Sequence, residues 1–387
     1  MSEWREYKLG EIADVQTGPF GSQLHQSDYV DVGIPSIMPV NIGERMNIST
    51  EKIVYITEKD AMRLSRYRVQ NGDIVYSRRG DVEKCAYINE SEEGWLCGTG
   101  CLRIRIDSAH ADSKFVAYYL STEDMKSWIS NNAVGTTMPN LNSSILQQVP
   151  LSLPSLDEQK RIASILSSLD DKIDLLNREN ATLEAMAETL FRQWFIEEAK
   201  EDWEEGKLED EFDFTMGQSP SGDSFNEEGV GIPMYQGNAD FGFRFPTRRV
   251  YTTQPTRFAE VNDTLISVRA PVGAQNMAME KCCIGRGVAA FRYKKKPSYF
   301  SYTYYKFKSL LEEIKQFNDN GTVFGAMSKS DFENLEITIP DENTIMSFQQ
   351  QVKIIDDKIV NNNNEIQTLI QTRDGLLQKL MGGEMKI

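Results

Sequence analysis

The sequence predicts an α+β fold in which two similar α/β domains are separated by a pair of long antiparallel helices. The helices would form an intramolecular coiled coil with pseudo-twofold symmetry. Three observations predict this fold. The segment LDDKI at 169–173 returns as IDDKI at 355–359, further landmarks recur at the same offset of 186 residues, and each copy ends in a long heptad pattern. A repeat of this length indicates a duplicated domain and not a solenoid.

The landmarks of the repeat lie along both halves of the 387-residue chain. Gly135-Thr136 corresponds to Gly321-Thr322, and Pro154 corresponds to Pro340. Upstream the offset drifts, as insertions in loops would cause. The looser matches are Gly33-Ile34-Pro35 with Gly231-Ile232-Pro233, and Trp4 and Lys8-Leu9 with Trp203 and Lys207-Leu208. The chain is therefore predicted to contain two copies of a unit of about 190 residues.

Each copy is expected to contain a globular part followed by one long helix. Runs such as GDIVYS at 72–77, CLRIRI at 101–106 and NDTLISV at 262–268 are typical of strands bounded by turns. Short helical stretches are expected near 113–131 and 299–318. A proline closes the apolar alternations VPLSLP and LEITIP, and a long helix should begin after each. The predicted boundaries are 1–154 and 200–340 for the globular domains, and 155–199 and 341–387 for the helical regions.

The two long helices carry sustained heptads, and each inward seam contains one asparagine. The seam of the first helix is Ile162, Leu166, Leu169, Ile173, Leu176, Asn180, Leu183, Ala187, Leu190 and Trp194, and the second is Phe348, Val352, Ile355, Ile359, Asn362, Ile366, Leu369, Arg373, Leu376 and Leu380. Parallel helices in register would face each asparagine with an apolar side chain, and an unpaired buried amide costs about 1–3 kcal/mol. Antiparallel helices instead place Asn180 opposite Asn362, and this pairing is predicted. Alternatively, either asparagine could lie at a slightly exposed position, and it would then not indicate the orientation of the helices.

Antiparallel helices from a duplication create a pseudo-twofold axis, with the globular domains expected at opposite ends of a stalk. Residues 158–194 would span about 55 Å as a helix. The repeated DDKI is expected to place a carboxylate pair and a lysine toward solvent on each helix. Phe191 and Phe195, next to Trp194, are expected either to stay exposed for partner helices or to pack on the second globular domain.

The chain is acidic, with a formal net charge of −16 at pH 7, which argues superficially against a nucleic-acid partner. The distribution of charge matters more than its sum. Residues 155–213 hold 7 basic and 18 acidic side chains, a net of −11, whereas residues 214–340 hold 15 and 13, a net of +2. Residues 1–154 hold 15 and 20, and residues 341–387 hold 5 and 7. The sequence is therefore compatible with a local basic face on either domain.

The sequence contains no recognisable catalytic motif. It lacks a GxxxxGK[ST] phosphate loop, a GxSxG elbow and an HExxH helix, and it has only two histidines. Glu-x-Lys matches at 198–200 and 205–207 fall in an acidic run where chance matches are expected. The five cysteines are expected to be buried free thiols, so no metal site and no cofactor are predicted. No membrane-spanning run or secretory signal is found, and a cytoplasmic location is expected.

A rigid spacer carrying two similar domains suits a bipartite target, and duplex DNA is such a target. Over essentially its whole length, the chain resembles the specificity subunit of type I restriction-modification systems. The segments that carry the resemblance are WREYKLGEI, GPFGS at 18–22, Gly72-Asp73-Ile74, PLSLPSLDEQKRIASILSSLDDKIDLLNREN at 150–180, GQSP at 217–220, GIPMYQGNADF at 231–241 and LLQKLMGGE at 376–384. The entry to the second helix, IPDENTIMSFQQQ, departs from the expected Pro-rich, EQ-type pattern.

The resemblance implies a non-catalytic subunit with two target recognition domains and two helical regions. It implies that each recognition domain reads one half of a split, asymmetric sequence in double-stranded DNA, and that the helices set the spacer. The implied partners are two adenine-methyltransferase subunits and, for cleavage, motor-endonuclease subunits. A specificity subunit of a related multisubunit restriction system and a coiled-coil scaffold without DNA reading are the alternatives. A scaffold would not need two divergent domains with arginine-bearing polar loops.

Candidate DNA contacts in the first domain follow from the side chains that read bases and phosphates. They lie in three loops: Ser77, Arg78 and Arg79 after a strand; Thr136, Thr137 and Asn140 before the last strand; and Ser22, Gln23 and His25. In the second domain the matching candidates are Gln218, Ser219, Tyr235, Gln236, Asn238, Arg269 and Thr322, with Arg248, Arg249 and Lys294-Lys295-Lys296 as phosphate candidates. For partner subunits, the outward helix faces offer Arg161, Asp171, Lys172, Asp357 and Lys358.

Overall fold

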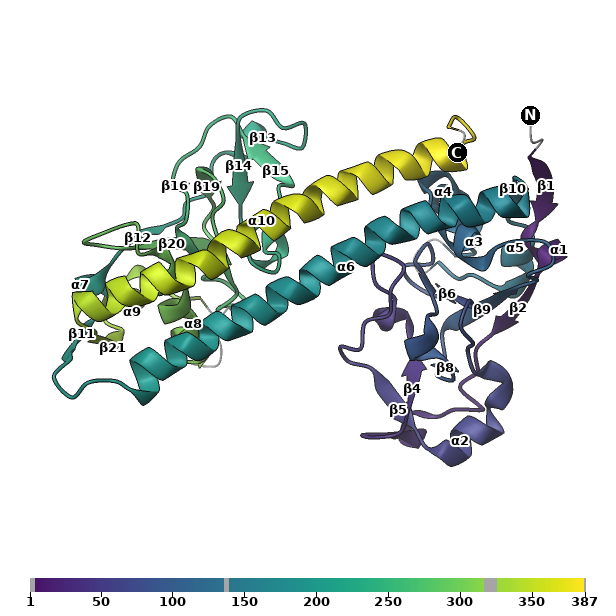
Figure 1. Cartoon of the computed structure of the whole chain (residues 1–387), viewed down its shortest axis with the longest axis horizontal. Coiled ribbons are helices and arrows are strands. Elements are labelled where there is room, and N and C mark those ends of the chain that lie inside the picture. Colours follow the sequence, from purple (N-terminus) through teal and green to yellow (C-terminus); the bar gives the residue numbers. More distant parts are fainter. Residues whose placement is uncertain (1–3, 136–138, 317–325, 386–387) are drawn as a thin grey trace. The chain divides into compact units, whose positions relative to one another are not determined.

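The structure, a computed structural model, describes residues 4–135, 139–316 and 326–385. The chain divides into two compact units, Met1–Asp174 with Ile366–Ile387, and Leu175–Glu365. The long helices α6 (Leu156–Arg192) and α10 (Glu342–Met381) contribute to both units (Figure 1). Each helix begins two residues after its proline, Pro154 or Pro340, as the sequence predicts.

The first unit contains two four-stranded sheets and a separate two-stranded ribbon. The first sheet has the order β2 (Ala13–Thr17), β9 (Cys101–Ile106), β6 (Ile74–Ser77) and β7 (Cys85–Tyr87), and the second has the order β3 (Tyr29–Val30), β5 (Val54–Ile56), β4 (Ile34–Ile37) and β8 (Leu96–Cys97). Strands β1 (Arg5–Lys8) and β10 (Pro150–Leu153) form the antiparallel ribbon directly before α6. Its short helices are α1 (Leu9–Ile12), α2 (Glu58–Arg63), α3 (Ser113–Leu120), α4 (Glu123–Asn132) and α5 (Ser143–Gln147).

The second unit repeats this topology, strand by strand, and adds one edge strand. Its sheets have the orders β12 (Phe212–Met216), β20 (Val288–Tyr293), β17 (Thr264–Ser267), β18 (Gln275–Met277), and β13 (Phe225–Asn226), β15 (Val250–Thr252), β14 (Ile232–Tyr235), β19 (Cys282–Ile284), β16 (Phe258–Ala259). The ribbon is β11 (Glu204–Lys207) with β21 (Glu336–Ile339), and the short helices are α7 (Leu208–Glu211), α8 (Phe300–Gln316) and α9 (Lys329–Glu333). The predicted duplication is confirmed.

Equivalent side chains also form equivalent contacts in the two units. Arg105 on β9 pairs with Asp73, and Arg292 on β20 pairs with Asp263. The register places Arg105 opposite Asp14 and Arg292 opposite Asp213, so the two ion pairs occupy the same position in both sheets. The duplication therefore preserved polar interactions on an interior strand of each sheet as well as the order of strands.

The helical stretch predicted near 113–131 is two helices, α3 and α4, whereas the stretch near 299–318 is the single helix α8. The break lies at Ser121-Thr122. The Ser121 hydroxyl donates to the Tyr118 carbonyl oxygen (2.8 Å) and the Thr122 hydroxyl donates to that of Tyr119 (2.8 Å). Such local bonds compete with the helical pattern, and Thr122 then serves as the N-cap of α4.

The predicted antiparallel pairing of the long helices is confirmed in both units. In the second unit, the Asn362 amide donates to the Asn180 side-chain oxygen (2.9 Å), and both residues are buried. The Asn362 amide also donates to Glu179 (2.9 Å). Trp194 and Phe348, the last layer of the predicted seam, make an edge-on contact at 6.0 Å between ring centroids. In the first unit, Ile162 and Leu380 lie in one apolar cluster.

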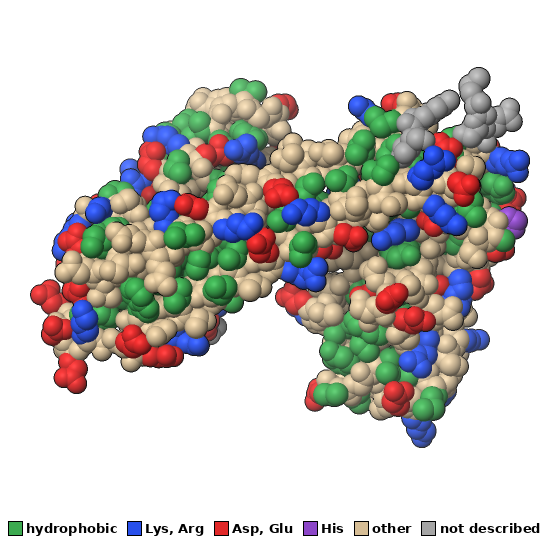
Figure 2. Space-filling view, viewed as in Figure 1, with side chains coloured by type: hydrophobic (Ala, Val, Ile, Leu, Met, Phe, Trp, Pro, Cys, Tyr) green, Lys and Arg blue, Asp and Glu red, His purple; other side chains and the backbone are tan. Residues whose placement is uncertain are grey.

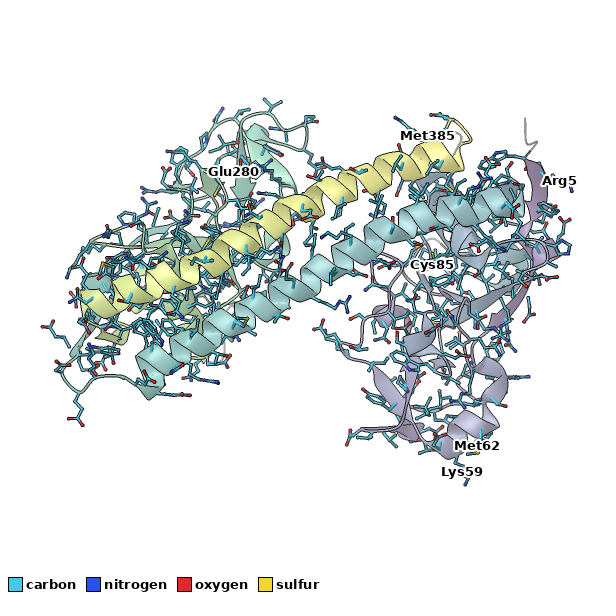
Figure 3. All side chains as sticks on the ribbon, viewed as in Figure 1. Arg5, Lys59, Met62, Cys85, Glu280 and Met385 are labelled. Carbon is cyan, nitrogen blue, oxygen red and sulfur yellow. The ribbon has the colours of Figure 1, made fainter. Side chains whose placement is uncertain are left out.

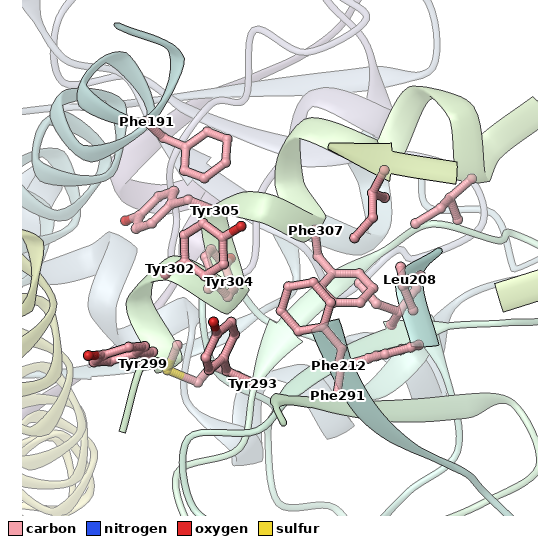
Figure 4. Close-up of a cluster of buried hydrophobic side chains, with 14 of the residues drawn as sticks. Phe191, Leu208, Phe212, Phe291, Tyr293, Tyr299, Tyr302, Tyr304, Tyr305 and Phe307 are labelled. Carbon is pink, nitrogen blue, oxygen red and sulfur yellow. The ribbon is translucent and has the colours of Figure 1, made fainter. Parts of the chain in front are cut away.

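The core of the second unit is rich in aromatic rings. Figure 4 shows Phe212, Phe291 and Phe307 together, with Tyr302 beside Tyr293. Phe191 on α6 and Phe195 in the π-helical turn that follows it (Gln193–Glu197) are 3% and 8% exposed, and both contact Tyr302 of this core. Of the two alternatives drawn from the sequence, packing on the second globular domain is therefore the one observed.

The expectation that DDKI places a carboxylate pair in solvent is wrong for the first aspartate of each pair. Asp356 is buried, and Asp170 is half-buried with its carboxylate bonded to two partners. The heptad explains the error, because Asp170 and Asp356 directly follow the seam residues Leu169 and Ile355. Only Asp171, Asp357 and the two lysines are exposed.

Candidate nucleic-acid interface

In the first unit, three loops meet at one end of the β2–β9–β6–β7 sheet. The Gly18 N–H donates to the Cys101 carbonyl oxygen (2.9 Å), and the Arg78 N–H donates to that of Gly100 (2.8 Å). A Cβ atom at Gly18 would lie 2.2 Å from the Gly98 carbonyl oxygen, so only glycine allows this approach. The loops after β2 and β6 are thus fastened to the turn Gly98–Gly100 that precedes β9.

The third predicted loop joins this cluster through its described residues. Arg79 forms an isolated β-bridge with Asn140, and the Leu141 N–H donates to the Arg78 carbonyl oxygen (2.8 Å). Thr136 and Thr137 lie outside the described residues. The sequence-predicted groups around Ser22, Arg78 and Asn140 therefore come from separate parts of the chain to a single end of the sheet.

The candidate DNA-contact residues of the first unit differ in how exposed their side chains are and in whether they already have hydrogen-bond partners. Arg79, Ser22 and His25 are exposed. The Ser77 side chain is buried and its hydroxyl donates to the Arg79 carbonyl oxygen (3.0 Å), so it shapes the loop. The Gln23 side-chain oxygen accepts a bond from the Tyr67 hydroxyl (2.8 Å), which directs that amide into the domain.

The same cluster recurs in the second unit. Three backbone N–H groups donate to carbonyl oxygens around the turn 285–287: Gly217 to Val288 (2.9 Å), Gln218 to Ile284 (3.0 Å) and Val268 to Gly287 (2.9 Å). Arg269 bridges Ala326, as Arg79 bridges Asn140. Thr322 lies outside the described part of the chain. By these shared backbone bonds, Gly18 corresponds to Gly217, Arg79 to Arg269, and the turn 98–100 to the turn 285–287.

The loop after β14 reaches the same turn. The Gly285 N–H donates to the Tyr235 carbonyl oxygen (2.8 Å), and the Gln236 N–H donates to the Asp240 carboxylate (2.6 Å). Gln236 and Asn238 are exposed, whereas Tyr235 is buried, and burial raises the pKa of its hydroxyl. The backbone of this loop, with Gln236 and Asn238, therefore belongs to the cluster, and the Tyr235 ring supports it from inside.

Of the phosphate candidates of the second unit, Arg249 adjoins these loops through Asp240, which also accepts the Gln236 N–H, whereas the three lysines do not. Arg248 pairs with Glu280 (2.5 Å), which Figure 3 labels, and Arg249 pairs with Asp240 (2.7 Å). Lys294–Lys296 follow the C-terminal end of β20, while the turn 285–287 precedes its start. A strand of six residues separates these ends by about 20 Å. The three lysines thus stay a prediction without support from this cluster.

Three residues of the cluster were not among the predicted contacts. Phe20 is 52% exposed, and the Arg78 guanidinium carbon lies 5.5 Å from its ring centroid. Thr99 and Arg286 are the middle residues of the turns GTG and GRG. A signal was present, because both Gly-x-Gly turns stand directly before strands at corresponding places in the repeat, β9 and β20.

The first aspartates of the DDKI repeat, Asp170 and Asp356, join the long helices to the globular domains. We refer to them as the anchor aspartates. Asp170 accepts bonds from the Tyr118 hydroxyl (2.5 Å) and from Arg373 (2.8 Å). Asp356 accepts a bond from Arg244 (2.6 Å), whose side chain is 1% exposed and stacks at 3.4 Å from the Tyr304 ring centroid.

The predicted partner-binding residues lie on exposed positions of the helices. Arg161 donates to the Asp157 carbonyl oxygen (3.4 Å), Asp357 pairs with Lys353 (2.5 Å), and Lys358 pairs with Glu179 (3.4 Å). Figure 2 shows acidic and basic side chains interspersed along the visible helix surface. Surface pairs of this kind contribute about 0–1 kcal/mol, so they leave the helix faces open to other partners.

Comparison with known proteins places this arrangement in a family. The profile described as "Type I restriction modification DNA specificity domain" matches residues 1–185 and 200–372, once for each copy of the repeat. The chain belongs to this family. It is a DNA specificity subunit of a type I restriction-modification system with two target recognition domains, and this kind of subunit is non-catalytic.

Relatives of this family match the chain over its whole length. The putative type I restriction enzyme MjaX specificity subunit of Methanocaldococcus jannaschii is 29% identical over 100% of this chain and 94% of its own length. The HindI specificity subunit of Haemophilus influenzae is 21% identical over all of both chains. The crystal structure of the type I S subunit from M. genitalium superposes with a TM-score of 0.62 over 97% and 96% of the chains, at 18% identity, and shows the shared fold.

All five cysteines are free and buried. Over the described ranges, no group of three or more His, Cys, Asp and Glu side chains is arranged to hold a metal ion, and no helix is both long and apolar enough to cross a bilayer.

Proposed function

We propose that each target recognition domain binds one half of a bipartite DNA sequence through the loop cluster at the end of its main sheet. The recurrence of that cluster carries the proposal. In both units, the loops after two strands, β2 and β6 or β12 and β17, are hydrogen-bonded at a Gly-x-Gly turn and the strand that follows it. In both, an arginine beside this turn, Arg79 or Arg269, forms a β-bridge. A duplicated site with different side chains suits a target of two unlike halves.

In this proposal, residues 1–154 and 200–340 form the recognition domains, and residues 155–199 and 341–387 form the helical regions. The helices set the distance between the half-sites and hold two adenine-methyltransferase subunits, with motor-endonuclease subunits joining for cleavage in the cytoplasm. Three apolar side chains on the helices are exposed, and they support this role: Leu175, Met186 and Ile354. A helix pair without partners would be expected to turn polar side chains toward solvent, so exposed apolar residues favour contact with another subunit.

Single-molecule methylation sequencing of the host genome, with and without this gene, tests the proposal. The expected result is the loss of one N6-methyladenine motif made of two unlike half-sites around a fixed gap. If no motif changes while affinity capture of the tagged chain recovers an active adenine methyltransferase, the proposed DNA reading is wrong. If no methyltransferase is captured, the proposed partner binding fails.

A further inference from the structure

The two recognition domains can be compared position by position, because their backbone hydrogen bonds define which residues correspond. A contact that grips the DNA backbone is needed in both half-sites. A contact that reads a base must differ wherever the two half-sites differ. Residues shared by the two clusters are therefore candidates for backbone contact, and residues that differ are candidates for base contact.

Arg79 and Arg269 are the shared arginines of the clusters. Both are exposed and both sit at the bridge beside the last loop. The middle residue of the Gly-x-Gly turn differs, since Thr99 in the first domain corresponds to Arg286 in the second. Arginine is the side chain best suited to a bidentate contact with the guanine edge, whereas a short threonine makes weaker and less selective contacts.

The turn that carries Arg286 is fixed from three sides. The Arg286 N–H donates to the Ser219 hydroxyl (3.3 Å), Gly285 is bonded to Tyr235, and Gly287 accepts from Val268. A Cβ atom at Gly287 would lie 2.1 Å from the Gln236 carbonyl oxygen, so the turn is packed against the neighbouring loop. A side chain on such a turn is presented in a defined direction, which base reading requires.

The Arg286 side chain itself is exposed, and no ion pair or side-chain hydrogen bond engages its guanidinium within the described ranges. This separates it from Arg248, Arg249 and Arg292, whose guanidiniums already bind Glu280, Asp240 and Asp263. The backbone of Arg286 is thus held rigidly, its guanidinium is free to donate hydrogen bonds, and the residue lies at the centre of the cluster.

We propose that Arg286 reads a guanine in the half-site bound by the second recognition domain. The proposal rests on the proposed function, because it presumes that the loop cluster faces DNA. It assigns the specificity of one base pair to one residue, and it assigns backbone contact to Arg269. Thr99, at the same place in the first domain, has a buried hydroxyl, so no guanine requirement is predicted at the corresponding position of the other half-site.

The test uses strains that express the wild-type chain, Arg286→Ala, Arg286→Thr or Arg286→Lys with its partner subunits, and compares their genomic methylation motifs. Exchanging residues 1–154 first establishes which half-site belongs to the second domain. In that half, Arg286→Ala and Arg286→Thr are expected to turn one guanine position degenerate, with preference falling from about 10–100-fold to nearly none. The other half should stay unchanged.

Two variants separate base reading from other roles. Arg286→Lys keeps the charge but loses the bidentate fork, so it should also relax that one position. Arg269→Ala should instead lower methylation at all sites without changing the motif. Arg286→Thr carries the residue that the first domain accepts in the same turn, which guards against a folding failure.

Several outcomes would overturn the proposal. A wild-type second half-site without a G·C pair would do so, as would an unaltered motif in Arg286→Ala, or a uniform loss of methylation that Arg286→Lys restores. In each of these cases the wild-type strain still shows a bipartite motif. A wild-type strain with no bipartite motif would instead contradict the proposed function itself.

Discussion

The two anchor aspartates occupy the same place in the repeat, yet they hold their globular domains differently. In the first unit, Asp170 binds Arg373 from α10 and Tyr118 from α3, and the side chains of Asp170 and Arg373 are 19% and 15% exposed. In the second unit, Asp356 binds Arg244 from the loop between β14 and β15, and their side chains are 3% and 1% exposed. The same aspartate thus takes its cation from a helix in one unit and from the recognition domain in the other.

A contact that is duplicated in the sequence can therefore differ between the two copies in how much it stabilises the fold. An ion pair with some exposure is screened and can be replaced by water, whereas a fully buried pair depends on its partner. Arg244 is also close to Glu184 on α6 (3.6 Å), so one side chain contacts both long helices. The second recognition domain is therefore held on its helices by a buried cation, whereas the cation that the first domain offers to α6, Arg45 paired with Asp174 (3.3 Å), is partly exposed.

The largest expected effect is that of Arg244→Met. It leaves the buried Asp356 carboxylate without a cation, so the free energy of unfolding of the second unit should fall by about 3–5 kcal/mol. Arg373→Met, the matched change in the first unit, should cost about 1 kcal/mol. Urea denaturation of both variants gives the comparison. Equal losses would show that the two anchors are equivalent and that burial does not distinguish them.

The second effect concerns Glu211, a buried carboxyl at the position that Ile12 occupies in the first unit. Burial raises the pKa of Glu211 to about 7, although Lys306 and the Tyr302 hydroxyl favour its charged form. Because the pKa is higher in the folded state than in the unfolded state, this group's contribution is fully present below about pH 4 and is lost as the pH rises through 7.

The expected measurement is the unfolding free energy of the native chain and of Glu211→Gln at pH 5 and pH 8. The wild-type chain should lose about 2.5 kcal/mol relative to the variant between these pH values. Ile12→Val in the first unit serves as a control without a titrating group. A difference between wild type and Glu211→Gln that does not change with pH would contradict the raised pKa.

The asparagine layer should have a smaller effect. Asn180→Leu removes the acceptor of the Asn362 amide, but Glu179 still accepts from it, so the loss should be about 1–2 kcal/mol. The double variant Asn180→Leu/Asn362→Leu should recover most of this loss, because no buried amide remains. A double variant less stable than the single variant would contradict this expectation. It would show that the hydrogen-bonded amide pair stabilises the helices more than two leucines do.

The smallest effect is expected for Lys294→Ala. The first unit has Asp107 at the corresponding place, and the Lys294 ammonium donates to the Glu209 carbonyl oxygen (3.0 Å), away from the loop cluster. Its loss should leave the salt dependence of DNA binding unchanged, whereas Arg269→Ala should reduce the slope by about one phosphate contact. A reduced slope for Lys294→Ala, measured by anisotropy with the assembled methyltransferase complex, would extend the interface to the far end of β20.

Much of the fold could be predicted from the sequence because repetition and heptads depend on local patterns. The Asn180–Asn362 layer followed from counting positions along two helices, and each helix start followed from a proline. The fate of Phe191 and Phe195 could not be decided, because a helix pattern does not say which domain folds back onto it. The inward turn of Asp170 and Asp356 was missed because an aspartate beside a seam is normally solvated.

The sequence predicted most of the loops of the candidate interface, but not all of the residues that lie in it. Loops that follow strands in corresponding places, such as those of Arg79 and Arg269, were identified because the repeat marks them. Arg286 and Thr99 were missed because only backbone bonds between distant segments show that the Gly-x-Gly turn lies at the centre. The ion pairs that occupy Arg248 and Arg249 also depend on tertiary contacts, which composition does not reveal.

The central claim is that the two copies are separate readers of two half-sites. The most direct test replaces residues 1–154 with the corresponding domain of another specificity subunit and sequences the methylated motifs. The account predicts that one half of the motif changes while the other half is retained. A change in both halves, from a chain that still folds and supports methylation, would contradict it.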